Sequence, residues 1–302
     1  MSTSITLWVD TDYGFDDLWA LLVLARHGRT PAGISLVAGN APLTRVIANA
    51  RGGAAAYDLQ APLYAGAAQP LVRPLDTATR VLGPKGMSSR GPMLPEIPGA
   101  ALPDAIPALA DWLLAAAPNA PREILALGPL TNIARLLTEA PEAAQKITRL
   151  VWMGGSNGPG NHSPRAEFNA LADPEAAAQL AAAGLPLEVA DLMLCRQVTF
   201  GPEDMPATDV LTAGLLQGYL DIGLSRGRAG MAIYDPVAAM VYLRPDLFQS
   251  RPCDLSVSTT DDDSYGETTF APNPHGTTRL VTAATDDIAQ ACLACLSGWT
   301  IP

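Results

Sequence analysis

Leu7-Trp-Val-Asp-Thr-Asp-Tyr-Gly-Phe-Asp-Asp-Leu-Trp-Ala-Leu-Leu22 is the stretch of the chain that decides its fold. It joins an apolar run over residues 5–9, which has the length of a buried strand, to an apolar helix predicted over residues 18–26. Gly14 lets the chain turn sharply between the two. Four aspartates lie at this turn within eight residues: Asp10, Asp12, Asp16 and Asp17.

This group of carboxylates has two explanations. In the first, Asp16 and Asp17 stabilise the helix N-terminus through its dipole, Asp10 ends the strand and Asp12 is solvated. In the second, the four carboxylates converge, repel one another and resist joint ionisation unless a hard cation such as Ca²⁺ or Mg²⁺ binds between them. We favour the second, because strand ends in open α/β sheets are where ligands bind. An EF-hand is excluded, since the twelfth position counted from Asp10 is Leu21 rather than glutamate.

Composition limits the class of protein. The chain has 302 residues, of which 48% are hydrophobic, and a formal net charge of −11. That charge argues against nucleic acid or an anionic membrane as the main partner. No apolar run approaches the ~20 residues that cross a bilayer, and residues 1–7 do not resemble a signal peptide, so we expect a cytoplasmic protein. Cys292 and Cys295 have no second cysteine pair, which favours buried thiols over zinc.

Strand-like and helix-like segments alternate along the chain. This alternation predicts an α/β fold with a mostly parallel, open, Rossmann-like sheet and helices on both faces, formed by residues 1–302 as a single domain. Residues 66–104, rich in proline and glycine, are predicted to be an irregular connection. Strands are predicted over residues 5–9, 34–38, 62–65, 123–127, 148–153, 187–189, 254–259 and 278–282, and helices over 18–26, 43–58, 105–117, 130–140, 174–183, 209–224, 235–242 and 286–296.

Polar residues recur where the predicted strands end. Asn40 follows the second strand and is consistent with either a simple turn or a site residue. Leu127 precedes the turn Gly128-Pro-Leu-Thr-Asn132. Starting a helix is enough to explain this turn, but the turn also leaves the Leu127 carbonyl available to a ligand. Asp235 precedes Pro236 at a predicted helix start, where a capping role and a ligand role can coexist.

A further polar stretch runs from Met153-Gly-Gly155 to Asp173. Glu167 and Asn169 alternate around Phe168, so an extended backbone would point both side chains to one face. Carboxylate and amide groups together suit recognition of vicinal hydroxyls, because they supply acceptors and donors. We therefore expect a sugar-binding segment here, with Asp173 also capping the next helix.

Taken in order, these five segments between residues 10 and 239 resemble the inosine/uridine-type nucleoside hydrolases. These are Ca²⁺-dependent enzymes that cleave the N-glycosidic bond of ribonucleosides to free base and ribose. Asp10-Thr-Asp-Tyr-Gly-Phe-Asp-Asp17 is similar to their N-terminal signature, except that the family usually has proline in place of Tyr13. The resemblance implies the nucleoside hydrolase fold, a small nucleoside as substrate and a homo-oligomer, dimeric or tetrameric.

The resemblance also implies roles for individual residues. Ca²⁺ would be held by the carboxylates of Asp12, Asp17 and Asp235 and the backbone oxygen of Leu127, while Asp12 would also be the general base. Asp10 would be a buried supporting carboxylate. The nucleoside would be bound by Asp16, which accepts from the 2′-hydroxyl, and by Asn40, Met153, Asn161, Glu167 and Asn169.

The chain departs from the family where the base should leave. Many members have histidine at the positions of Tyr234 and Leu82. Tyr234 is the remaining candidate acid, although an unperturbed tyrosine pKa near 10 makes it a poor one. Three histidines are present: His27 at the end of the first predicted helix, and His162 and His275 in loops from which a side chain could reach the base. The sequence leaves base specificity and the leaving-group acid open.

Two other functions compete with this interpretation. An aspartyl-nucleophile, Mg²⁺-dependent phosphatase would use Asp10 as nucleophile and Asp12 as acid. It would leave the segment from Glu167 to Asn169 unexplained, and Lys85 and Lys146 are the only lysines available to hold phosphate. A non-catalytic nucleoside- or ribose-binding protein would explain the missing histidines.

Overall fold

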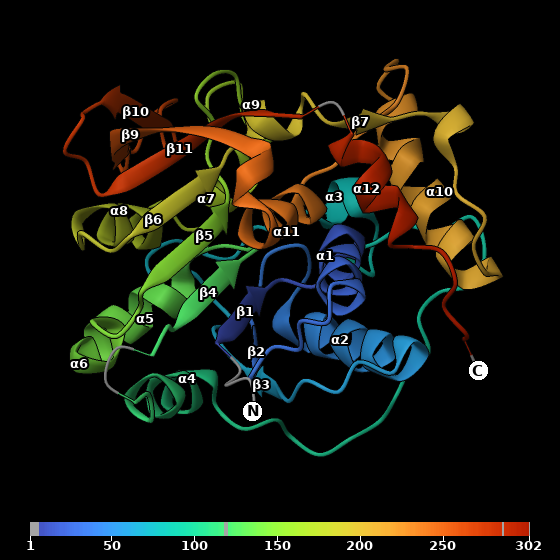
Figure 1. Ribbon diagram of the computed structural model, residues 1–302, viewed down its shortest axis with the longest axis horizontal. Coiled ribbons are helices and arrows are strands. Elements are labelled where there is room, and N and C mark those ends of the chain that lie inside the picture. Colours follow the sequence, from blue (N-terminus) through green and yellow to red (C-terminus); the bar gives the residue numbers. More distant parts are fainter. Residues whose placement is uncertain (1–5, 118–119, 286, 302) are drawn as a thin grey trace.

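The computed structural model describes residues 6–117, 120–285 and 287–301, and it has the predicted α/β architecture (Figure 1). One nine-stranded sheet has the order β10-β9-β11-β6-β5-β4-β1-β2-β3, and it is parallel from β11 to β3. Its strands are β1 (Leu7–Thr11), β2 (Ile34–Leu36), β3 (Leu63–Ala65), β4 (Glu123–Ala126), β5 (Arg149–Met153), β6 (Leu187–Ala190), β9 (Phe248–Val257), β10 (Thr268–Pro272) and β11 (Thr278–Ala284).

Helices cover both faces of this sheet, as predicted (Figure 1). The α-helices are α1 (Phe15–Arg26), α2 (Leu43–Tyr57), α3 (Thr79–Leu82), α4 (Ala105–Leu114), α5 (Thr131–Glu139), α6 (Pro141–Ala144), α7 (Phe168–Ala172), α8 (Pro174–Ala182), α9 (Leu192–Cys195), α10 (Val210–Leu224), α11 (Asp235–Leu243) and α12 (Ile288–Ala294). Two short 3₁₀ helices, η1 (Pro202–Asp204) and η2 (Pro245–Leu247), and a two-stranded sheet of β7 (Thr199–Phe200) and β8 (Met231–Ala232) complete the described elements.

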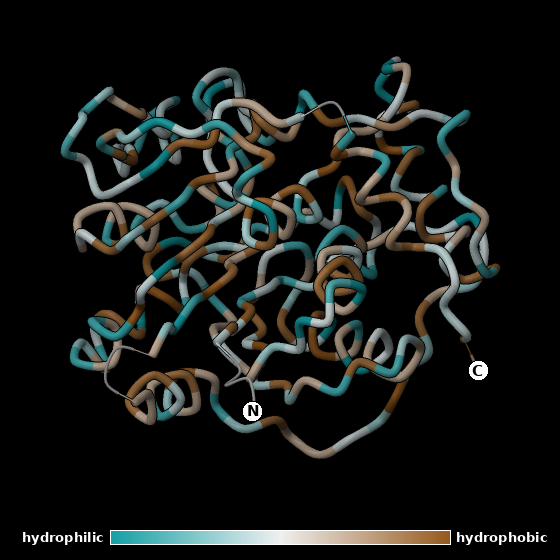
Figure 2. The backbone as a smooth tube through the Cα atoms, in the orientation of Figure 1, coloured by the Kyte–Doolittle hydropathy of each residue, from teal (hydrophilic) through white to brown (hydrophobic). Residues whose placement is uncertain are grey.

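The central strands are buried on both faces. Val9 and Val151 pack with α1, α10 and α11, whereas their neighbours Trp8 and Trp152 pack with α4, α5 and α8 on the other face. This alternation follows from the two-residue period of a strand. Each fully buried large apolar side chain stabilises the fold by about 1.5–3 kcal/mol. Hydrophobic residues accordingly concentrate in the interior strands and helices, while hydrophilic residues concentrate in the loops (Figure 2).

Strand β1 occupies the position that determines where a ligand can bind. It lies between β2 and β4, and Asp10 is in register with Ser35 on one side and Ala126 on the other. The chain goes from β1 outward in one direction to β2 and β3, and later returns to β4 on the other side. In an open α/β sheet, the crevice at such a switch point lies outside the carboxyl ends of the strands, which is where the β1–α1 turn lies.

Several local predictions were wrong. Residues 168–172 form α7 rather than an extended segment, so the alternation argument for Glu167 and Asn169 fails. The connection over residues 66–104 contains the short helix α3, and β9 begins at Phe248 rather than at residue 254. The sequence pattern did not indicate α6, α9, β7, β8 or β10. The predicted starts at Ile5 and Asp286 lie outside the described residues.

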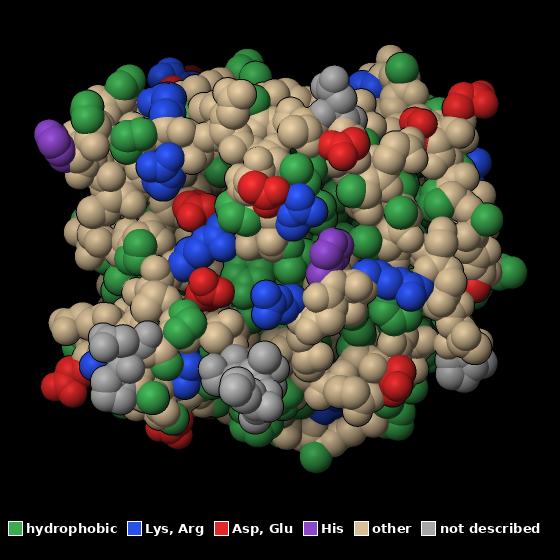
Figure 3. All heavy atoms as spheres, viewed as in Figure 1, with side chains coloured by type: hydrophobic (Ala, Val, Ile, Leu, Met, Phe, Trp, Pro, Cys, Tyr) green, Lys and Arg blue, Asp and Glu red, His purple; other side chains and the backbone are tan. Residues whose placement is uncertain are grey.

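The cysteines, the surface charges and the helices of the described residues bear on the remaining expectations. Its four cysteines are free and buried, so Cys292 and Cys295 are the predicted thiols. Basic and acidic side chains are interspersed on the face shown in Figure 3 rather than gathered by sign. No helix within the described ranges is both long enough and apolar enough to cross a membrane. The single-domain assignment stays a prediction.

Candidate active site

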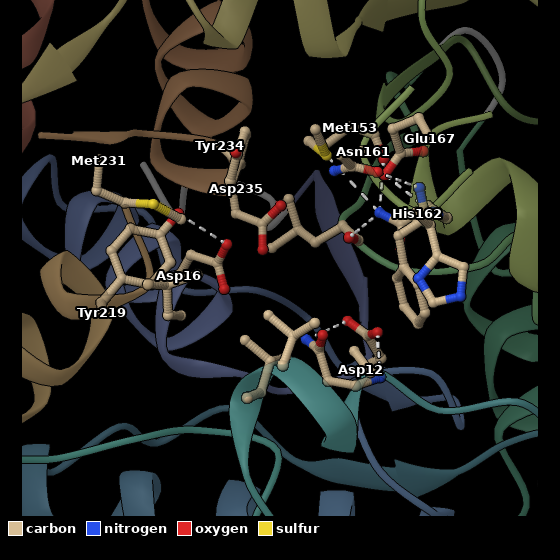
Figure 4. A pocket seen from close by; sticks show the side chains of 18 of the residues that line it. Asp12, Asp16, Met153, Asn161, His162, Glu167, Tyr219, Met231, Tyr234 and Asp235 are labelled. Carbon is tan, nitrogen blue, oxygen red and sulfur yellow. Dashed lines mark hydrogen bonds between the residues drawn. The ribbon is translucent and has the colours of Figure 1, made fainter. Parts of the chain in front are cut away.

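A pocket with a cavity volume of about 110 Å³ opens where the carboxyl ends of the parallel strands meet (Figure 4). Eight of the predicted site residues line it: Asp12, Asp16, Asn40, Leu127, Met153, Asn161, Glu167 and Asn169. Tyr234 and Asp235, at the start of α11, line it as well.

Asp16, Asp17 and Asp235 form the centre of an acidic cluster. One carboxylate oxygen from each lies within 4.8 Å of the others, so the three could share a metal ion. Asp12 joins the cluster through Asn40, whose Nδ2 donates to Asp12 Oδ1 at 3.1 Å and to Asp17 Oδ2 at 3.2 Å. The backbone N–H of Asn40 also donates to Asp12 Oδ2 at 2.7 Å. The structure therefore brings Asp17 and Asp235, two of the expected metal ligands, together with Asp16, whereas Asp12 lies beside this group, linked to it by Asn40.

The turn between β1 and α1 explains how these aspartates are held. Tyr13 adopts a left-handed conformation with φ of 41°, and its N–H donates to Thr11 Oγ1 at 3.1 Å. Asp17 accepts from the Gly14 N–H at 2.7 Å, which fixes its carboxylate at the start of α1. A Cβ at Gly14 would lie 2.6 Å from Asn40 Nδ2, so only glycine permits the amide of Asn40 to approach.

The electrostatics of the cluster favour a cation. Burial raises the pKa values of Asp12, Asp17 and Asp235, and repulsion from Asp17 adds to the increase for Asp12 and Asp235. Desolvation and the neighbouring Asp17 raise the pKa of Asp16 to about 7. Among the described residues, no lysine, arginine or histidine forms an ion pair with these groups. Such oxygen ligands without a counter-charge fit a hard divalent ion.

Asp10 lies below the pocket rather than in its lining. Its Oδ1 accepts from Asn132 Nδ2 at 2.7 Å and from the hydroxyl of Ser35, while its Oδ2 is buried without a hydrogen-bond partner in the described structure. Burial raises its pKa to about 6. Asn132 also accepts from the Ala67 N–H at 2.8 Å, so Asp10 ties β1 to the start of the long connection. This position agrees with the supporting role expected for it.

Glu167 and Asn169 form one wall of the pocket through helix α7 rather than through a strand. Glu167 is the N-cap of α7 and accepts from the N–H groups of Asn169, Ala170 and Gly155 at 2.8–3.1 Å. Burial nevertheless raises its pKa to about 7. Asn169 Nδ2 donates to the Leu127 and Met153 carbonyls at 2.8 and 2.9 Å, which fixes the ends of β4 and β5 against α7.

The opposite wall was not predicted from the sequence, apart from Tyr234. Its described residues include Tyr219 and Ile222 on α10, Arg226 just beyond that helix, and Met231 on β8. The Tyr219 hydroxyl lies 3.2 Å from Asp16 Oδ2 and 3.1 Å from the Ala232 carbonyl. Tyr219 and Ile222 share a helix face because they are three residues apart, but nothing in that spacing identified a ligand rather than a core.

The three histidines have different positions. His27 caps the C-terminus of α1, as expected, and its Nδ1 lies 2.9 Å from the Val23 carbonyl. His275 is exposed in the turn between β10 and β11. His162 lines the pocket, but on the side of Asn161 and Glu167 rather than the side of Tyr219 and Met231 (Figure 4).

Comparisons with known proteins agree with this geometry. The family model described as inosine-uridine preferring nucleoside hydrolase matches residues 7–291. A non-specific ribonucleoside hydrolase, RihC, of Salmonella enteritidis is 36% identical over 275 residues, which cover 89% of this chain and 88% of that protein.

Solved structures share the fold. A purine-preferring ribonucleoside hydrolase from Gardnerella vaginalis superposes with a TM-score of 0.85 at 21% identity, covering 97% of this chain and 98% of that one. A plant nucleoside hydrolase superposes with a TM-score of 0.83 at 21% identity, with the same coverage. Neither a phosphatase nor a non-catalytic binding protein finds support in these comparisons. The chain therefore belongs to the inosine-uridine preferring nucleoside hydrolase family, whose reaction is the hydrolysis of the N-glycosidic bond of ribonucleosides.

Proposed function

We propose that this protein hydrolyses ribonucleosides to free base and ribose with a Ca²⁺ ion held by Asp12, Asp17, Asp235 and the backbone oxygen of Leu127. One observation carries the proposal: the carboxylates of Asp16, Asp17 and Asp235 from α1 and α11 converge, with Asp12 beside them, and none of them pairs with a cationic side chain among the described residues. When bound, the ion lowers the pKa of a water molecule and anchors the hydroxyls of the sugar.

Asp12 acts as the general base in this proposal. Both of its oxygens are oriented by Asn40, which fixes the carboxylate toward the pocket. Asp12 takes the proton of the attacking water. Asp16 accepts a hydrogen bond from the 2′-hydroxyl and is itself oriented by Tyr219.

Asn161, Glu167 and Asn169 bind the ribose. The amide nitrogen of Asn169 is already engaged by two carbonyl groups, so its Oδ1 is the group left for a sugar hydroxyl. Glu167 accepts three backbone N–H groups and keeps a lone pair for a further donor. These contacts orient the sugar while positive charge develops on its anomeric carbon, which is where transition-state stabilisation is needed.

Tyr234 is the proposed partner of the leaving base. Burial raises its pKa above the ordinary value, so we expect it to donate a hydrogen bond as a neutral phenol rather than to transfer a proton freely. Tyr234→Phe should lower kcat by about 3- to 10-fold, the effect of losing one neutral hydrogen bond. Steady-state release of ribose measures this, with Tyr242→Phe, at the opposite end of α11, as the control. Unchanged turnover would remove Tyr234 from the mechanism.

Calcium binding should stabilise the protein more at higher pH. The pKa of Asp16 is raised from 3.8 to about 7 in the folded protein. The stability that Asp16 contributes to the metal-free protein is therefore fully present below pH ~4 and is lost as the pH rises through the pKa of the folded state. The metal-free protein should therefore lose stability over this range, while calcium competes less with protons. At 100 times its Kd, calcium should add about 2.7 kcal/mol. Thermal unfolding with EDTA and with CaCl₂ measures the stabilisation by calcium. A calcium-induced increase in Tm that becomes smaller as the pH rises would contradict the prediction.

The test of the proposed function is a panel of purine and pyrimidine ribonucleosides incubated with Ca²⁺ or with EDTA and scored for free ribose. Ribose released only with the metal is the expected result, and no release from any nucleoside would refute the proposal. The pattern across the panel would also reveal the base preference. A homodimeric or homotetrameric state is a further proposal from the family resemblance, and light scattering would test it. A cytoplasmic location is a further proposal from the sequence pattern.

A further inference from the structure

A second hollow adjoins the active-site pocket. It is an open groove with about 1250 Å³ of empty space, bounded by the connection after β3, the loop before α7 and the loop between β9 and β10. His162 and Phe168 line both hollows, so these two side chains separate the groove from the active site. No role proposed above uses this groove.

The geometry of ribose indicates which end of a substrate would face the groove, given the proposed function. The base is attached at C1′ and the 5′ carbon at C4′, the two ring carbons that flank the ring oxygen, so the two substituents diverge from opposite ends of that edge of the ring. Figure 4 shows Tyr219 and Met231 on one side of the carboxylates and Asn161 and His162 on the other. With the base beside Tyr234 and the 2′- and 3′-hydroxyls at the carboxylates, the 5′ carbon points toward His162.

His162 fills this end of the site but is weakly held. Its ring lies 5.1 Å from the ring of Phe168, centroid to centroid, and its side chain is 18% exposed. Its Nε2 lies 3.7 Å from Asp76 Oδ2, which is too long for a hydrogen bond. Substitution of His162 should therefore open the boundary between the groove and the active site with little effect on the surrounding structure.

The groove beyond His162 is acidic. Asp76, Asp262 and Asp263 line it. Its two arginines are already engaged: Arg73 lies 3.4 Å over the ring of Tyr265 and pairs with Asp261, and Arg165 pairs with Glu267 at 2.6 Å. Of these carboxylates, Asp76 pairs with Arg80 at 3.0 Å. Among the described lining residues the aspartates outnumber the arginines, so a phosphate placed there would be repelled, whereas a neutral or cationic group would not.

We propose that His162 limits the enzyme to nucleosides with an unextended 5′-hydroxyl, and that shortening this side chain joins the site to a groove that accepts neutral or cationic 5′ substituents but not phosphate. His162 is thus a specificity residue for the 5′ end of the substrate. The proposal rests on the sugar orientation given above, and it is separate from the question of which base is released.

The experiment compares kcat/KM for a nucleoside that the wild-type protein cleaves with kcat/KM for its 5′-methylthio, 5′-amino and 5′-phosphate derivatives. The wild-type protein should prefer the parent by about 10-fold or more, since steric discrimination by one small group is of that order. In His162→Ala the preference over the methylthio and amino derivatives should fall to within about 3-fold, while the phosphate stays a poor substrate. His162→Gln, which keeps most of the bulk, and His275→Ala should retain the wild-type ratios.

An unchanged ratio in His162→Ala, or a wild-type protein that cleaves the methylthio derivative as well as the parent, would overturn the proposal. Binding of pseudouridine and its 5′-methylthio derivative, measured by calorimetry with Ca²⁺, gives a readout independent of turnover, because their carbon–carbon glycosidic bond is not hydrolysed. For the wild-type protein and for His162→Ala, the ratio of the two Kd values should match the corresponding ratio of kcat/KM for the parent and its methylthio derivative. Absence of turnover would refute the proposed function, whereas equal wild-type Kd values for the two C-nucleosides would refute the role of His162.

Discussion

Asp12→Ala is expected to lower kcat/KM for ribonucleoside hydrolysis by about 10³-fold and to abolish calcium binding at the same time. A general base alone contributes about 10²- to 10⁴-fold to a rate. Asp12 is also one of the buried carboxylates around the proposed metal site, and Asn40 orients its side chain toward that site. Removing this side chain therefore removes the proton acceptor and a metal ligand in one step.

Calorimetric titration with CaCl₂ and assays of free ribose measure the two losses separately. The matched control is Asp111→Ala, which removes an exposed aspartate from α4 and should change neither. Retained turnover in Asp12→Ala would reject the proposed site. Loss of turnover with calcium affinity intact would keep Asp12 as a base but remove it from the set of ligands.

The parts of the site that could be predicted are those in which chemistry is concentrated in a few neighbouring residues. The β1–α1 turn is an example, because a strand, a glycine and four carboxylates follow one another within one short stretch. Asp235 was identifiable for the same reason, since it directly precedes Pro236 at a helix start. In such segments local physics and the function require the same residues, so the pattern is visible without the fold.

The wall formed by α10 and β8 could not be predicted in this way. Tyr219, Ile222 and Met231 are ordinary core residues by composition, and only the packing of α10 against α1 and β8 brings them to the site. Glu167 and Asn169 line the pocket, but they reach it through the start of α7 and not through the strand alternation that selected them. The edge strand β10 was missed because it ends in Pro272, a residue usually found at sheet edges or outside strands.

Asp235→Asn should have opposite effects on activity and on the stability of the metal-free protein. Asp235 is buried and is repelled by Asp17, Asp16 and Asp12. A neutral amide of the same shape removes this repulsion, so the free energy of unfolding without metal should rise by about 1 kcal/mol, the scale of other stabilising substitutions at functional sites. The lost metal ligand should lower kcat/KM by about 10²-fold or more, since even residues behind metal ligands contribute 10- to 100-fold.

The size of this gain in stability should itself depend on pH. Because its pKa is raised, Asp235 stays protonated to a higher pH than an exposed aspartate, and in the acidic range asparagine replaces a group that is already neutral, so we expect little difference there. At higher pH the wild-type carboxylate ionises against its neighbours, and the variant should become the more stable of the two metal-free proteins. Chemical denaturation with EDTA at about pH 5 and pH 8 measures this, and added CaCl₂ should reverse the order by stabilising only the wild-type protein. A variant that is less stable than the wild-type protein at pH 8 without metal would mean that the buried carboxylates do not oppose one another, and the case for a cation at this site would fail with it.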